Sequence, residues 1–278
     1  MVKIICDSTG DVPADIRKQF DITIVPLNVI FGSDSYQDGV NLTPPQFYKM
    51  LVESKVHPTT SQPAPGLYEE AYRRLSKETD EIMVLTISGG ISGTRESAEQ
   101  AKKMVGNICK IEIIDTRMTC AGLLLPTLAA ARAAQKGLKL VEISGLINDM
   151  LPRLRVYMIF DTLEYLRKGG RIGRAKALLG GMLKLNPVLT LKDGVISPVS
   201  QARGRAKAME LLIDLMHKAG QPEEVVLEDA STPDDLNYIA RRVGEVLPKA
   251  SIIRSTVSPV IGVHTGPSVM VGGTISTV

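Results

Sequence analysis

Buried-strand patterns alternate with helical patterns in the first half of the chain, and this order restricts the fold more than any other feature. Apolar runs at residues 2–6, 81–87 and 110–114 have the length and content of buried strands. Helical patterns follow the last two runs, at residues 93–105 and 119–135. The order of strand, loop, helix and strand predicts a parallel sheet with ligands at the carboxyl ends of its strands.

The second half of the chain predicts a different kind of sheet. Apolar runs at residues 188–191 and 195–199 flank the turn Lys192-Asp193-Gly194, a pattern typical of an antiparallel hairpin. Helical and strand patterns then alternate to the end of the chain, at residues 205–218, 224–227, 233–246, 251–257 and 270–276. A change of sheet type indicates a change of domain.

Chain length supports two domains, because 278 residues exceed the usual size of one. We place the boundary after a helical pattern at residues 141–150. We therefore expect an α/β protein with an N-terminal Rossmann-like domain of parallel strands and helices, residues 1–152. A C-terminal α/β domain with a largely antiparallel sheet, residues 153–278, completes it.

Composition and charge exclude several classes of protein. A hydrophobic share of 44% and a charged share of 23% are those of a folded globular protein. No segment offers 18 uninterrupted apolar residues and the N-terminus lacks an export pattern, so we expect a cytoplasmic protein. The net charge of +3 is too small to indicate nucleic acid binding, although it permits transient contact with a membrane surface.

The cysteines indicate reduced thiols. Cys6, Cys109 and Cys120 are odd in number and show no CxxC pairing, so we expect neither a disulfide framework nor a zinc site. The histidines also lack metal-binding spacing, and we expect no metal catalysis.

A run of hydroxyl side chains is the first candidate binding segment. Thr59, Thr60 and Ser61 precede Gln62 and Pro63, just before a helix that opens with proline. Unpaired N–H groups and the dipole at a helix N-terminus favour an anion. One hydroxyl is enough for capping, so the excess is a hint of function.

A glycine-rich loop is the second candidate. Residues 88–94, Ser-Gly-Gly-Ile-Ser-Gly-Thr, lead from a strand into a helix. Glycines such as Gly93 let a ligand oxygen approach the backbone, and Ser92 can donate to it, so the loop indicates a phosphate or a carboxylate. It matches neither nucleotide fingerprint, and no GxSxG elbow supports a serine hydrolase.

Basic residues and one histidine complete the candidates. Arg171 follows a glycine pair in the segment at residues 162–173, and Arg203 follows the hairpin. Both arginines are also consistent with solvated surface charges. The glycine pair is also consistent with the end of a helix. His264 stands between glycines, whereas we place His57 and His217 at exposed helix ends.

The acidic turn Asp7-Ser8-Thr9-Gly10-Asp11 has two interpretations. Its two carboxylates are four positions apart and could bind a cation or a partner. Turn formation and helix capping explain the same residues.

Taken together, these segments resemble the DegV family of bacterial fatty-acid-binding proteins. Their order and spacing along the whole chain carry the resemblance more than any single motif. One departure is Gly266-Pro267-Ser268, where the family usually has Gly-Pro-Gly after the histidine. The matching segments are residues 7–11, 36–39, 60–63, 88–94, 162–173, 185–187 and 262–267.

The resemblance implies a non-enzymatic, lipid-carrying protein. It implies that a long-chain fatty acid lies in an apolar tunnel between two α/β domains, without a cofactor or metal. It also implies that a separate fatty-acid kinase phosphorylates the carboxylate that this protein presents. The head-group contacts carried over by the resemblance are Thr60, Ser61, Ser92, Gly93 and His264, with Arg171 and Arg203 as supporting basic groups.

Two alternatives stay open at this point. One is an acyl hydrolase or transferase with Ser92 as nucleophile and His264 as base, although no acidic residue is evident to orient the histidine. The other is a regulator that binds a small anion or a nucleotide through the glycine-rich loop.

Overall fold

The structure, a computed structural model, describes residues 1–180 and 185–277. Its first sheet is parallel throughout and has the strand order β2-β1-β6-β7. The strands are β1 (Lys3–Asp7), β2 (Thr23–Val25), β6 (Glu81–Thr86) and β7 (Lys110–Asp115).

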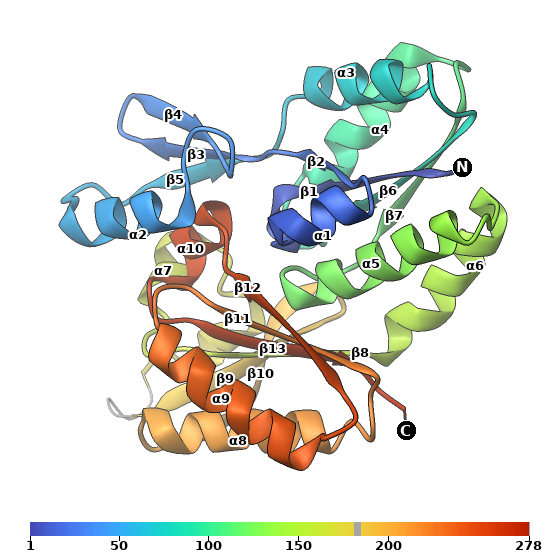
Figure 1. Cartoon of the computed structure of the whole chain (residues 1–278). Coiled ribbons are helices and arrows are strands. Elements are labelled where there is room, and N and C mark those ends of the chain that lie inside the picture. The colour runs from blue at the N-terminus through green and yellow to red at the C-terminus, as the bar shows by residue number, and fades with distance from the viewer. Residues whose placement is uncertain (181–184, 278) are drawn as a thin grey trace.

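Helices cover both faces of the first sheet (Figure 1). Alternate residues of a strand point to opposite faces of the sheet. On one face, Ile5 and Val84 pack with Tyr68 from the first pair of helices. On the other face, Ile4 packs with Leu124 from the second pair. The first pair is α3 (Pro65–Leu75) and α4 (Thr94–Val105), and the second is α5 (Ala121–Gln135) and α6 (Leu140–Met150).

The second sheet is largely antiparallel. Its order is β10-β9-β8-β13-β11-β12, and the pair β11 and β12 is parallel. Helices α8 (Arg205–His217) and α9 (Pro233–Val246) lie on its outer face (Figure 1). The strands are β8 (Leu154–Ile159), β9 (Asn186–Lys192), β10 (Val195–Ala202), β11 (Glu224–Asp229), β12 (Ser251–Thr256) and β13 (Met270–Ile275).

Helix α5 lies between the two sheets and packs on both. Small residues allow this close approach. A Cβ atom on Gly273 of β13 would lie 2.4 Å from the Cβ atom of Ala121, and one on Gly122 would lie 2.8 Å from Val156. The largest hydrophobic core therefore contains residues from both halves of the chain.

A small third sheet, of order β4-β3-β5, stands beside the first. Its strands are β3 (Asn28–Phe31), β4 (Asp34–Gln37) and β5 (Thr59–Ser61). Helices α2 (Pro44–Glu53) and α10 (Pro259–Thr265) pack against each other here. Gly262 permits this contact, because a Cβ atom there would lie 2.5 Å from the ring of Phe47. The shorter helices are η1 (Ser8–Gly10), α1 (Ala14–Gln19), η2 (Leu151–Arg153), α7 (Glu164–Lys168) and η3 (Gly173–Leu178).

The predicted fold class is confirmed: a parallel sheet with helices precedes a largely antiparallel sheet. The division at residues 152 and 153 stays a prediction. The sequence patterns did not show β5, β8 or α10, which are short or lie next to the predicted boundary, whereas the helix end expected at the glycine pair of residues 169–170 is that of α7.

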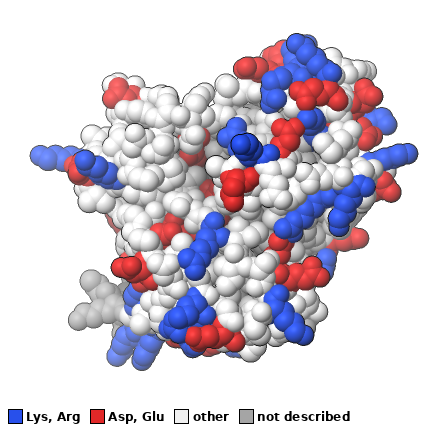
Figure 2. Space-filling model, in the orientation of Figure 1, with Lys and Arg blue, Asp and Glu red and all other residues white. Residues whose placement is uncertain are grey.

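Surface charge follows the balanced composition. Figure 2 shows basic and acidic side chains interspersed on the face in view. Among the described residues, no helix combines the length and apolar content that crossing a membrane requires.

Candidate ligand-binding site

A cavity of about 80 Å³ lies where the third sheet, the loop before α4, α7 and α10 meet the second sheet. Its walls combine two kinds of residue from distant parts of the chain. The apolar wall includes Leu27, Ile87, Met158, Leu166, Ile196 and Val260. The polar wall includes Thr60, Ser61, Ser92, Gly93, Arg171 and His264.

Thr60 and His264 are joined directly across this cavity. Thr60 lies in the middle of β5, opposite Val29 of β3, and His264 lies in the last turn of α10. The Thr60 Oγ1 and His264 Nε2 atoms are 2.8 Å apart, a hydrogen-bond distance. Because a hydroxyl and a neutral imidazole can both donate and accept, this pair can turn a donor toward a ligand oxygen.

The His264 ring is tightly enclosed. A Cβ atom on Gly169 would lie 2.0 Å from His264 Nδ1, so the ring position requires glycine there. Within the described part of the chain, Nδ1 is buried without a hydrogen-bond partner. Burial, then the charges of Arg171 and His57, lower the pKa of His264 to about 4. The imidazole is therefore neutral at pH 7, and a carboxylate beside it would favour its protonation.

Ser92 and Gly93 bring a helix N-terminus to the cavity. Gly93 is the N-cap of α4, and no side chain caps this helix. The free N–H groups of the first turn therefore suit an anion. The Ser92 hydroxyl lies 2.8 Å from the Thr94 hydroxyl, which leaves the pair free to donate one proton elsewhere.

Ser61 and Gln62 adjoin this helix end. Ser61 Oγ accepts a hydrogen bond from Asn28 Nδ2 at 3.1 Å. Gln62 Nε2 donates to Ser97 Oγ of α4 at 2.9 Å. A Cβ atom on Gly93 would lie 2.0 Å from Gln62 Oε1, so glycine lets β5 and α4 approach each other. Gln62 also lines the cavity and is not among the predicted contacts, although it stands within the hydroxyl segment.

Arg171 connects the loops on two sides of the cavity. Its Nε donates to the carbonyl of Ile91 at 3.1 Å, and its Nη1 donates to the carbonyl of Gly169 at 2.8 Å. The side chain is exposed, yet its charge lowers the pKa of His264. Arg203, also exposed, directly follows β10 and is not among the residues that line the cavity.

Two other predictions have clear outcomes. Asp7 is the N-cap of η1, as the capping interpretation expects, and its carboxylate accepts hydrogen bonds from Thr9 and from the Ile87 N–H.

The placement of His57 at an exposed helix end is wrong. His57 is half-buried in the loop before β5, where its ring contacts Tyr165, because α2 ends at Glu53.

The proposed nucleophile and base are not paired. The Ser92 hydroxyl contacts Thr94, and His264 Nε2 contacts Thr60. This geometry does not provide the Ser-His hydrogen bond on which the hydrolase alternative depends.

Comparison with known proteins shows the family. The family model described as "Uncharacterised protein, DegV family" matches residues 1–275. The chain belongs to the DegV family. A DegV domain-containing protein of Caldanaerobacter subterraneus is 36% identical over 96% of this chain and 95% of its own length. The family resemblance drawn from the sequence is thereby confirmed.

Solved DegV family structures share the fold over nearly the whole chain. A protein from Thermus thermophilus has a TM-score of 0.92 and 31% identity, and 99% of each chain is covered. DegV from Bacillus subtilis has a TM-score of 0.91 and 29% identity, again with 99% of each chain covered. Both of those proteins are described as fatty acid binding.

Proposed function

We propose that this DegV family protein binds one long-chain fatty acid and holds the carboxylate at Thr60, Ser61, Ser92, Gly93 and His264. The observation that carries the proposal is the Thr60–His264 pair in the polar wall of a cavity that also has an apolar wall. The relatives described as fatty acid binding support the ligand class.

The polar wall suits a carboxylate. A carboxylate that leaves water needs several donors to replace its hydration. The hydroxyls of Thr60 and Ser92, the α4 N-terminus and the imidazole of His264 are such donors. Arg171 adds a positive charge next to them. Of the two predicted supporting arginines, Arg171 is the one whose position supports the role.

The apolar wall suits the acyl chain. Each buried methylene contributes about 0.8 kcal/mol, so a long tail can supply most of the affinity. A cavity of about 80 Å³ is small for such a tail. Binding therefore requires side chains of the wall to move, and unbranched Met158 is suited to this because its rotamers change readily.

We further propose that the protein presents the acid to a separate fatty-acid kinase in the cytoplasm. Arg171 is exposed while His264 is largely enclosed, which suits a carboxylate close to the surface. Arg171 would also stabilise the extra negative charge of an acyl phosphate. In this role the protein needs no cofactor of its own, and it takes up lipid through transient contact with a membrane surface.

Mass spectrometry of the purified protein tests the ligand class. After denaturation, we expect about one equivalent of long-chain fatty acid per chain. A protein that carries only a nucleotide or phosphate, and that does not bind added palmitic acid, would contradict the proposal.

A second assay tests the kinase role separately. The loaded protein is mixed with a purified fatty-acid kinase and ATP, and acyl phosphate is trapped with hydroxylamine. Formation of hydroxamate only when both proteins are present supports presentation. Tight binding of fatty acid without hydroxamate would contradict presentation and leave binding intact.

A further inference from the structure

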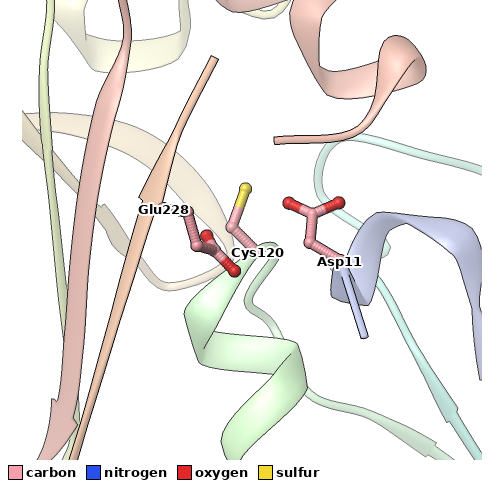
Figure 3. A group of neighbouring side chains, drawn as sticks. All are labelled: Asp11, Cys120 and Glu228. Carbon is pink, nitrogen blue, oxygen red and sulfur yellow. The ribbon is translucent and has the colours of Figure 1, made fainter. Parts of the chain in front are cut away.

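Three ionisable side chains converge in the interior, outside the proposed fatty-acid site. Asp11 follows η1, Cys120 precedes α5 and Glu228 lies on β11. One potential ligand atom of each lies within 4.8 Å of the other two. Figure 3 shows the Cys120 thiol between the two carboxylates. All three residues are buried, with 7% of Asp11 and none of Cys120 or Glu228 exposed, and none lines the fatty-acid cavity.

Each carboxylate leaves one buried oxygen without a partner. Asp11 Oδ1 accepts from the Ser258 N–H at 3.1 Å, and Glu228 Oε2 accepts from the Ala121 N–H at 3.0 Å. The other oxygens, Asp11 Oδ2 and Glu228 Oε1, have no hydrogen-bond partner among residues 1–180 and 185–277. Buried polar atoms are rarely left in this state, so two beside one thiol indicate a missing ligand.

The three side chains indicate the charge of that ligand, because thiolates and carboxylates are ligands of cations. Burial raises the pKa of all three groups well above ordinary values, and the charge of Asp11 raises the pKa of Cys120 and Glu228 further. Burial without a counter-charge therefore disfavours the charged forms of all three groups. A divalent cation reverses the balance, because it favours the thiolate and carboxylate forms and displaces the protons.

We propose that Asp11, Cys120 and Glu228 bind one divalent cation of the zinc type. A thiolate with two carboxylates favours a borderline ion such as Zn²⁺ over Mg²⁺ or Ca²⁺. In a tetrahedral zinc site, ligand atoms lie roughly 3.5 Å apart. Side-chain shifts of roughly 1 Å from the observed separations would close the site, with a water molecule as fourth ligand.

An approach to the site exists beside Asp11. A cavity of about 490 Å³ is lined by Asp11, Asp38 and Ser258, and its wall also includes the exposed arginines Arg17 and Arg254. The cation would join the residue that follows η1, the start of α5 and β11 of the second sheet. It would therefore fasten the two sheets to the helix that lies between them.

Cobalt substitution tests the proposal on the full-length chain. Protein freed of metal with a chelator, under a non-thiol reductant, is titrated with Co²⁺ and then Zn²⁺. We expect one equivalent of Co²⁺ with thiolate-to-cobalt absorption, displaced by Zn²⁺. At Zn²⁺ about 100 times Kd, Tm should rise by about 5 °C. Wild-type protein without this absorption would overturn the proposal.

Matched variants locate the thiol. Cys120→Ala and Glu228→Gln should lose the absorption, whereas Cys109→Ala, which removes a half-buried thiol elsewhere, should keep it. Absorption that persists in folded Cys120→Ala would overturn the proposal.

If these variants fail to fold, X-ray absorption of the wild-type zinc complex determines how many sulfur ligands the zinc ion has. One sulfur with oxygen or nitrogen ligands supports the site. A shell without sulfur, or with two or more sulfurs, contradicts it.

Discussion

Thr60 and His264 lie 204 positions apart in the sequence, and their side chains are 2.8 Å apart in the fold. One comes from an edge strand of the small third sheet and the other from the last turn of α10. Their contact places a hydroxyl and a neutral imidazole at a cavity that both halves of the chain line. We take this pair as the centre of the carboxylate site.

Removing the Thr60 hydroxyl should weaken fatty acid binding. Thr60→Val keeps the shape but leaves His264 and the ligand with one partner fewer, which costs about 1.4 kcal/mol, or roughly tenfold in Kd. Titration calorimetry with palmitic acid measures the change. Thr59→Val is the matched control, because Thr59 is exposed on the same strand and does not line the cavity. Equal losses in both variants would contradict the assignment of Thr60.

His264 should make the ligand-free protein less stable in acid. Its pKa is about 4 in the folded chain and about 6.5 in the unfolded chain, so between these values only the unfolded chain binds the proton. Stability is therefore lost as the pH falls from about 6.5 to about 4, by roughly 3 kcal/mol.

Urea unfolding of wild type and His264→Gln at pH 7.5 and pH 4.5 measures this effect. The difference between the two proteins isolates His264 from the buried carboxyl groups, which titrate in both. The wild type should lose more stability than the variant. Parallel pH profiles would show that His264 is not held neutral by its surroundings.

Gly169→Ala should impair binding through His264. The new Cβ atom would meet His264 Nδ1 at 2.0 Å and push the ring away from Thr60. We expect at least tenfold weaker binding and a loss of about 1–3 kcal/mol in stability. Gly145→Ala is the control, because its Cβ atom meets nothing within 4 Å in α6 and should stabilise by about 0.5–1 kcal/mol. Unchanged affinity in Gly169→Ala would show that binding does not depend on the position of the His264 ring.

Arg171→Gln should reduce both affinity and its dependence on salt. Arg171 holds the carbonyls of Ile91 and Gly169 and carries a charge beside the polar wall. We expect roughly fivefold weaker binding at low ionic strength and a smaller difference at high ionic strength, because salt screens exposed charges. Arg174→Gln is the control, since Arg174 is exposed and pairs with Asp193 outside the site. A loss of affinity shared by both variants would point to net charge instead.

Apolar patterns were enough to predict both sheets, because β6 of the first sheet and β11 of the second each bury five consecutive residues. They did not show β5, where three hydroxyl residues form a strand only because β3 pairs with them. α10 has seven residues and lacks the length of a recognisable helical pattern.

Long-range contacts set the limits of prediction at the sites. His264 was a candidate from its glycine-flanked position, but its contact with Thr60 depends on how α10 packs on α2 and the third sheet. Cys120 showed no metal-binding spacing, because its neighbours Asp11 and Glu228 come from separate segments that α5 brings together.

Carbon-13 NMR of carboxyl-labelled palmitic acid observes the bound carboxylate itself and so tests directly whether it lies at Thr60 and His264. We expect one bound carboxyl resonance whose chemical shift differs from that of the free acid. That shift should change in Thr60→Val and His264→Gln and stay the same in Thr59→Val. No bound resonance, or one whose shift changes in neither Thr60→Val nor His264→Gln, would contradict binding of the carboxylate at these two residues.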